Sequence, residues 1–315
     1  DTSGPDRSGP DTSGPDTSGP DTSGPDTSGP DTSGLCRSCR LTRTRPNDAA
    51  LGGDSRVAEQ FVRAEAAKRR LVFQLLESAL PLATYYDDPD SGLAFDFLVS
   101  QGDPVTIGHE DGVITIDLAE SDDAYRERMR AQLSEPYRTM LGHLRHEVGH
   151  YYWQVVVSGD DEVLGGFRRL FGDERADYQQ ALQRHYQGGP SPGWAEDHVS
   201  AYAAAHPWED WAETWAHYLH IRDTLQTAAS HGVIVTGPRF ESEPVDPRLE
   251  PSLMTAPALD LPDHLDEVLA EWFPLTYALN AINRSMGKDD LYPFVLSPKV
   301  IEKLRFVHRQ VLAQA

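Results

Sequence analysis

The chain of 315 residues has little cysteine, with Cys36 and Cys39 as its two thiols. So few cysteines exclude the small secreted scaffolds that depend on several disulfide bridges. The C-x-x-C spacing leaves three hypotheses: a redox pair, a zinc site completed by another chain, or a remnant of a zinc ribbon. A closed structural zinc site needs four ligands, and two cysteines supply half of them. We therefore favour the third hypothesis, in which Cys36 and Cys39 are what remains of a structural zinc site.

Long apolar runs and basic residues are also scarce. No run approaches the roughly 20 apolar residues of a membrane-spanning helix, and the first residues lack the basic and apolar regions of a signal peptide. Lys and Arg number 28 against 50 Asp and Glu, which gives a net charge of −22. An acidic chain is a poor partner for nucleic acid or anionic membranes. We expect a soluble cytoplasmic protein that binds neither, and the oligomeric state stays open.

The first 34 residues lack any large apolar side chain. They repeat the unit D-T-S-G-P, with Arg7 as the one substitution. Such a segment cannot bury enough surface to offset the entropy of ordering it, so we expect residues 1–34 to form a disordered tail. The rest is long enough for a substantial core. We assign residues 35–50 to the ribbon remnant and residues 51–315 to one larger domain.

The most informative motif is H-E-V-G-H, which comprises His146, Glu147 and His150. On an α-helix, residues four apart lie one turn above each other, so both imidazoles can bind one cation. Glu147 borders the same face and can reach a water molecule beside the cation without being a ligand. The motif therefore predicts half of a zinc site together with a general base.

The flanking residues predict a helix from Ser134 to Val157, with Ser134 as its N-cap. His143 lies near the face of the motif, but the spacing rule requires only the pair, and we do not expect it to be a ligand. Before this helix come short runs rich in β-branched and aromatic residues, at 93–99, 105–108 and 113–118. They predict a small antiparallel sheet.

A second helix follows Pro207 and reads H-P-W-E-D-W-A-E-T-W-A-H-Y-L-H. Its tryptophans cluster on one side, which leaves Glu209, Glu213 and His217 on the other. Catalytic zinc usually takes three protein ligands and leaves one position for water. A carboxylate from this second helix is the ligand that the first helix lacks.

Four stretches of the chain carry a family resemblance: L-C-R-S-C-R-L-T-R-T, E-P-Y-R-T-M-L-G-H-L-R-H-E-V-G-H-Y-Y-W, H-P-W-E-D-W-A-E-T-W-A-H-Y-L-H and L-N-A-I-N-R-S-M-G. On them, the chain resembles the zinc-binding metallopeptidases that join an N-terminal zinc ribbon to a gluzincin-type domain. The family's ribbon has an earlier C-x-x-C pair, and here the repeat tail stands in its position. The resemblance implies an α+β, zincin-like fold with sheet and metal helix up to about residue 160 and a mostly helical lobe after it. It also implies an edge strand that pairs with substrate, for which residues 113–118 are the candidate.

The resemblance further implies roles for the second helix. Gluzincin-like enzymes place an acidic or amide residue four positions after the ligand Glu, which assigns Glu209 to zinc and Glu213 to orienting a ligand histidine. The rival register shifts both roles by four residues, with Glu213 as the zinc ligand and His217 as the residue that follows it four positions later. Several such enzymes place a tyrosine that stabilises the oxyanion seven residues before the ligand Glu. That position is Tyr202 here, with Tyr178 as the second candidate.

Two functions from different classes follow. The preferred hypothesis is a metallopeptidase with one catalytic zinc ion, in which Glu147 accepts a proton from the attacking water and the substrate is a peptide or protein. The alternative is a zinc-stabilised binding module that recognises a protein partner without cutting it. A structural zinc site has no need of Glu147, which favours the enzyme. The sequence does not identify the substrate or the cleavage preference.

Overall fold

The computed structural model has an α+β fold in which a small sheet is combined with mostly helical structure. It describes residues 34–100, 105, 107–122, 125, 139–235 and 264–314. The predicted disordered tail lies outside these residues except for Gly34, so its disorder stays a prediction. None of the described helices has both the length and the apolar character that crossing a membrane requires.

The elements alternate between the sheet and the helices in the first half of the chain and are helical in the second. The strands are β1 (Thr42–Thr44), β2 (Ala94–Leu98), β3 (Gly108–Glu110) and β4 (Val113–Asp117). The α-helices are α1 (Asp48–Gly53), α2 (Ser55–Glu77), α4 (Met140–Val156), α5 (Asp161–Phe171), α6 (Tyr178–Gly188), α7 (Trp194–Asp197), α8 (Pro207–Ser230), α9 (Leu265–Ser285) and α10 (Pro298–Leu312). Short 3₁₀ turns are η1 (Cys39–Leu41), η2 (Leu118–Ser121) and η3 (Ala203–Ala205).

The sheet is mixed, so the predicted antiparallel sheet is wrong. Its order is β1-β2-β4-β3, with parallel pairing of β1 with β2 and of β2 with β4, and antiparallel pairing of β3 with β4. Asp111 and Gly112 have positive φ angles of 46° and 81°, and this two-residue turn makes β3 and β4 a hairpin. The hairpin places β4 next to β2, and these two strands run parallel. The residues that favour strands do not reveal this arrangement.

The same order changes which strand lies at the edge. Residues 113–118 contain β4, which lies between β2 and β3, so they are not the edge strand that we expected. The edge strand beside α4 is β3. At the other edge, β1 comes from residues 35–50, the predicted ribbon remnant, whose separate domain status stays a prediction.

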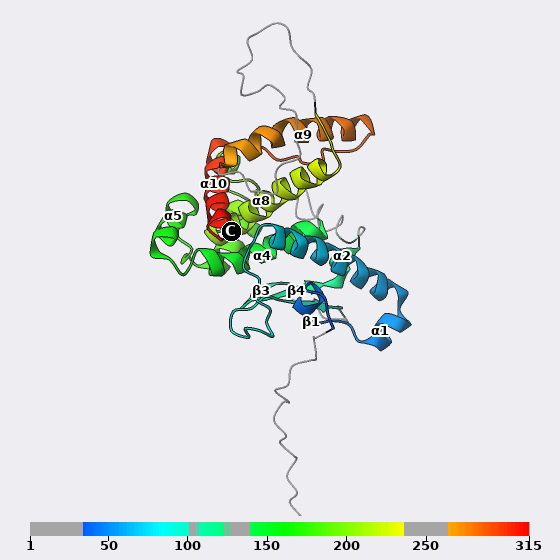
Figure 1. Cartoon of the computed structure of the whole chain (residues 1–315). Coiled ribbons are helices and arrows are strands. Elements are labelled where there is room, and N and C mark those ends of the chain that lie inside the picture. Colours follow the sequence, from blue (N-terminus) through cyan, green and yellow to red (C-terminus); the bar gives the residue numbers. More distant parts are fainter. Residues whose placement is uncertain are drawn as a thin grey trace, which may run out of the picture. The chain divides into compact units, whose positions relative to one another are not determined.

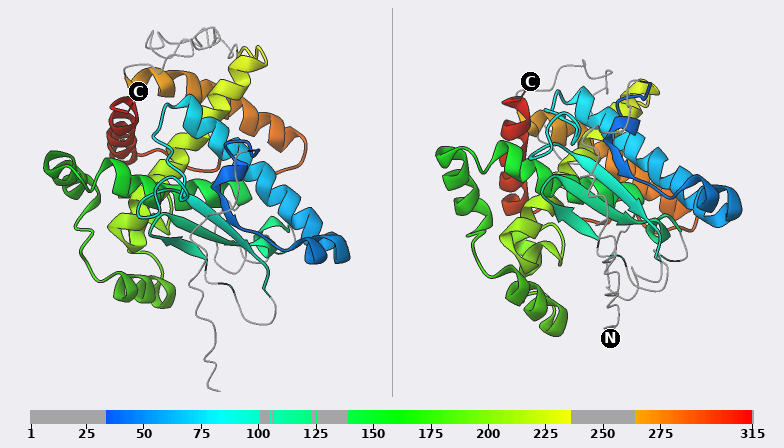
Figure 2. Two further views of the ribbon diagram at one scale, coloured as in Figure 1. Left: turned by 60° about the horizontal axis from the view of Figure 1, so that its bottom comes forward. Right: turned by 90° about the horizontal axis from the view of Figure 1, so that it is seen from below.

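Helices α2 and α4 lie on one side of the sheet, as Figure 1 shows from the side and Figure 2 from below. Successive side chains of a strand point to opposite faces, so Phe95 and Phe97 share a face of β2. Phe61 of α2 packs edge-on against Phe97 with ring centroids 6.0 Å apart. The buried Lys68 lies over both strand phenylalanines and forms an ion pair of 2.7 Å with Glu65. These contacts fix α2 on the sheet.

Helix α4 begins later than the sequence predicted. Thr139 is extended, and its side-chain oxygen accepts a hydrogen bond of 2.9 Å from the backbone N–H of Gly142. A threonine in this geometry is an N-cap, so it replaces Ser134, which lies outside the described residues. Leu144, Val148 and Tyr151 are buried, and the histidine motif lies within the regular helix.

A glycine allows α4 to lie close to α8. A Cβ atom on Gly149 would stand 3.0 Å from the Cα atom of Ala212, closer than most Cβ contacts in proteins, so a side chain here would press against the backbone of α8. Trp211 of α8 donates a hydrogen bond of 2.8 Å from its indole nitrogen to the carbonyl oxygen of Gly149. This close crossing brings the H-E-V-G-H motif of α4 beside the start of α8, where Glu209 and Glu213 lie.

Buried charges join the same helices further along. Asp223 of α8 accepts hydrogen bonds from Arg145 of α4 at 2.5 Å and from Arg70 of α2 at 2.9 Å. On the other side of α8, Lys303 of α10 forms an ion pair of 2.6 Å with Asp210. Removing one partner of such a pair leaves a buried charge uncompensated, so losing any of these residues would weaken the packing of α8 against its neighbours.

The described chain after residue 160 is mainly helical. Helices α5 and α6 are separate, because Gly172 ends α5 with a φ angle of 106° and Asp177 caps α6. Helices α9 and α10 complete this part and pack against α8.

Candidate metal site

Three potential metal ligands meet where α4 crosses α8. The His146 Nε2 atom lies 3.2 Å from His150 Nε2 and 3.0 Å from Glu209 Oε2, and His150 Nε2 lies 3.7 Å from Glu209 Oε1. All three donor atoms lie within 4.8 Å of one another. Within the part of the chain that the structure describes, no other group of three or more His, Cys, Asp or Glu side chains is close enough to hold a metal ion.

The three side chains are buried and interact strongly. Glu209 is 1% exposed, and burial alone would raise its pKa, but the His150 and His146 imidazoles hold it well below the usual range. Burial lowers the pKa of His146, whereas the carboxylates of Glu209 and Glu213 raise it well above the usual value. The carboxylate is therefore ionised at neutral pH, the state that binds a cation, and a metal that binds here would displace the extra proton of His146.

The second acid of α8 lies on the far side of the His146 ring. Glu213 Oε1 lies 2.8 Å from His146 Nδ1, and Ser200 donates a hydrogen bond of 2.5 Å to the other oxygen of Glu213. A carboxylate on Nδ1 fixes the tautomer of an imidazole and leaves the Nε2 lone pair available. Glu209 thus faces the donor atoms of both histidines, and Glu213 faces the opposite ring nitrogen of one. No motif or spacing in the sequence indicated this contact of Ser200.

Glu147 is buried beside this group without belonging to it. Its Oε1 atom lies 3.2 Å from the Nε2 atom of His143, one helical turn earlier. Burial raises the pKa of Glu147, but the hydrogen bond to His143 and the nearby imidazoles outweigh burial and lower the pKa to about 2. The carboxylate is therefore ionised at neutral pH.

His217, the partner in the rival register, lies apart from the three donor atoms. Its Nδ1 atom forms a hydrogen bond of 2.7 Å with the hydroxyl of Tyr292. Burial lowers the pKa of His217 to about 4, although Glu213 acts in the opposite direction. The geometry favours the register with Glu209 as ligand and Glu213 as orienting residue, and that assignment stays a prediction.

A pH-dependent stability follows from His217. Between pH 6.5 and pH 4 the unfolded state binds a proton at this residue and the folded state does not, so stability falls as the pH falls. The contribution is about 3 kcal/mol across this window. In His217→Gln, whose side-chain amide can still hydrogen-bond to Tyr292 but does not titrate, we expect a smaller loss of stability as the pH falls. Urea unfolding of both proteins at pH 7.5, 5.5 and 4.5 measures the free energy of unfolding. An equal decrease in wild type and variant would contradict the prediction.

Both candidate tyrosines lie close to the group. Tyr178, the first residue of α6, donates a hydrogen bond of 2.6 Å to Glu209 Oε1. Tyr202 is largely buried, with its ring centroid 5.9 Å from that of His146, and burial raises its pKa well above 10. Its hydroxyl makes no hydrogen bond within the described residues. Tyr202 thus has an uncommitted donor, whereas the hydroxyl of Tyr178 is already paired.

The sequence did not reveal two aromatic neighbours of His150. Trp208, expected on the side of α8 away from the acids, has its ring centroid 4.5 Å from that of His150. His109 of β3 stacks on the imidazole of His150 with a centroid distance of 6.4 Å, and burial lowers the pKa of His109 to about 4. These rings shield His150 and bring the edge strand to the site; no periodicity or spacing in the sequence connects β3 with α4.

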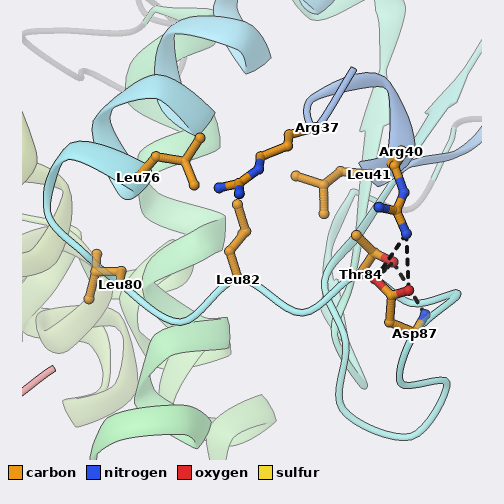
Figure 3. A pocket seen from close by; sticks show the side chains of 8 residues that line it. All are labelled: Arg37, Arg40, Leu41, Leu76, Leu80, Leu82, Thr84 and Asp87. Atoms are coloured by element: carbon orange, nitrogen blue, oxygen red, sulfur yellow. Dashed lines mark hydrogen bonds and ion pairs between the residues drawn. The ribbon is translucent and has the colours of Figure 1, made fainter. Parts of the chain in front are cut away.

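The cysteine pair lies elsewhere. Cys36 and Cys39 are free thiols with their sulfur atoms 3.4 Å apart, and no third potential metal ligand joins them within the described residues. Beside them is a cavity of about 320 Å³ (Figure 3). It is lined by Arg37, Arg40, Leu41, Leu76, Leu80, Leu82, Thr84 and Asp87. The cavity includes no residue of the candidate metal site.

Comparison with known proteins gives a family and relatives. A family model described as "Putative zinc-binding metallo-peptidase" matches residues 57–310. The chain is 50% identical over 277 residues to uncharacterized proteins of Mycobacterium bovis and of two strains of Mycobacterium tuberculosis, an alignment that covers 88% of this chain and 76% of each relative. No solved structure matches the chain.

Proposed function

The chain belongs to the family described as "Putative zinc-binding metallo-peptidase", and from that premise we propose that it is a zinc-dependent peptidase with its active centre at the crossing of α4 and α8. The observation that carries the proposal is the convergence of His146, His150 and Glu209, whose donor atoms lie within 4.8 Å of one another. Two imidazoles and one carboxylate are a ligand set that catalytic zinc uses, with one position left for water.

The donor set fits zinc in its details. Imidazole nitrogen and carboxylate oxygen both suit Zn²⁺, and the carboxylate of Glu209 faces both histidines. The contact between Glu213 and the Nδ1 atom of His146 matches the way carboxylates orient metal-binding histidines. When bound here, zinc would polarise the scissile carbonyl and lower the pKa of a water molecule to about 7.

The protein's own groups would move the proton. Glu147 is ionised and buried at the site, so it would accept a proton from the attacking water and pass it to the leaving amine nitrogen. A non-catalytic zinc module would have no use for such a carboxylate, which is why we prefer the peptidase. Strand β3, the edge strand beside α4, is where an extended peptide could add to the sheet.

Metal removal tests the proposal. Zinc-loaded protein should cleave members of a broad peptide library, chelation should abolish the cleavage, and added zinc should restore it. Mass spectrometry of the products identifies the bonds. Zinc-loaded protein that retains one ion per chain and cuts no peptide would argue for the binding module instead.

Tyr202 is our candidate for stabilising the oxyanion. Its ring lies beside that of His146, and its hydroxyl has no hydrogen-bond partner within the described residues, so it is free to donate to the oxygen that becomes negative during attack. Tyr202→Phe should therefore keep zinc and lose roughly 10²- to 10³-fold in kcat, the usual cost of removing one such donor. Tyr178→Phe, which removes the hydrogen bond to Glu209, should act mainly on zinc affinity. Steady-state kinetics and zinc titration of both variants distinguish them; full turnover in Tyr202→Phe would exclude its role.

A further inference from the structure

His143 lies one turn before Glu147 on α4, and the two side chains touch. Its Nε2 atom is 3.2 Å from Glu147 Oε1, and both side chains are largely buried, with 15% and 9% exposed. Residues four apart on a helix are neighbours, so the backbone itself sets the imidazole above the carboxylate. A buried carboxylate requires hydrogen-bond donors, and His143 supplies one.

The contact fixes the direction of the hydrogen bond. Carboxylate oxygens only accept, so the Nε2 atom of His143 carries the hydrogen and donates it to Glu147. Within the described residues, His143 is the side chain that donates to Glu147. The other ring nitrogen, Nδ1, lies 3.8 Å from Oε2 of Glu120, an acid that is 1% exposed and lies in η2 directly after β4. The imidazole thus lies between an acid that follows the sheet and the base on the metal helix.

This arrangement gives His143 a role apart from metal binding. Its ring nitrogens face two acids, and it does not belong to the group formed by His146, His150 and Glu209. We propose that His143 is a positioning residue that holds Oε1 of Glu147, so that the second carboxylate oxygen stays aimed at the attacking water. The inference rests on the proposed peptidase function, because it concerns the general base of that reaction.

Removing the donor should reduce turnover without removing the metal. We expect His143→Ala and His143→Phe to retain one zinc ion and wild-type KM and to lose roughly 10- to 100-fold in kcat, the range for groups that orient a catalytic residue. The phenylalanine keeps the ring volume in case alanine impairs folding. His143→Gln should restore most of kcat, because a glutamine amide can donate to a glutamate four residues later. His231→Ala, an exposed histidine at the end of α8, is the control.

Crystal structures of the zinc-loaded variants supply a measurement independent of turnover. Wild type and His143→Gln should show one Glu147 conformer, and the alanine and phenylalanine variants should show several. A single unchanged conformer, or full kcat, in both variants that lack the donor would overturn the proposal. If wild type cleaves no peptide, the conformers of Glu147 still decide the role of His143, and the peptidase function alone fails.

Discussion

Glu147→Gln should retain zinc and lose roughly 10²- to 10⁴-fold in kcat on any peptide that wild type cleaves. The amide keeps the size of the carboxylate but cannot take a proton from water. Glu147 is not one of the three proposed ligands, so the substitution should leave the zinc stoichiometry near one ion per chain. Single-turnover kinetics with zinc-loaded protein measure the loss.

The control is Glu162→Gln, the same substitution at an exposed position of α5, which should match wild type. Because Glu147 hydrogen-bonds to His143, the thermal midpoints of both variants should be compared first. An active Glu147→Gln enzyme would remove Glu147 as the base and require another group to accept the proton.

The second large effect concerns zinc itself. Glu209→Ala removes the carboxylate that faces both histidines and should lose most of the zinc affinity. Glu213→Ala removes the partner of His146 Nδ1 and should weaken affinity or activity by roughly 10- to 100-fold. Competition with a fluorescent chelator measures both affinities. Stoichiometry near one for Glu209→Ala and near zero for Glu213→Ala would reverse the two roles.

The candidate site was largely predictable because its spacing is local. His146 and His150 are one turn apart on one helix, and Glu209 and Glu213 are one turn apart on another, so periodicity alone gives each face. What joins the two faces is a contact between Gly149 and Ala212, which is a property of packing between distant segments. The pattern of a polar stripe backed by tryptophans gave the second helix, but it placed Trp208 on the wrong side.

The sheet was less predictable than the site. Strand-forming residues identified three runs, but pairing depends on connections rather than on composition. The Asp111–Gly112 turn makes one hairpin, and the remaining pairs are parallel. For the same reason, the sequence could not reveal that His109 of the edge strand reaches the ring of His150. The start of α4 was also displaced, because Thr139 and Ser134 are both plausible caps and the structure uses the former.

The central claim is that the crossing of α4 and α8 holds one zinc ion. Anomalous diffraction at the zinc edge from crystals of zinc-loaded protein tests it most directly. We expect one peak, about 2.0–2.2 Å from the Nε2 atoms of His146 and His150 and from the Glu209 carboxylate. A peak bound by Glu213 in place of Glu209, or none at this crossing in fully loaded protein, would contradict the account.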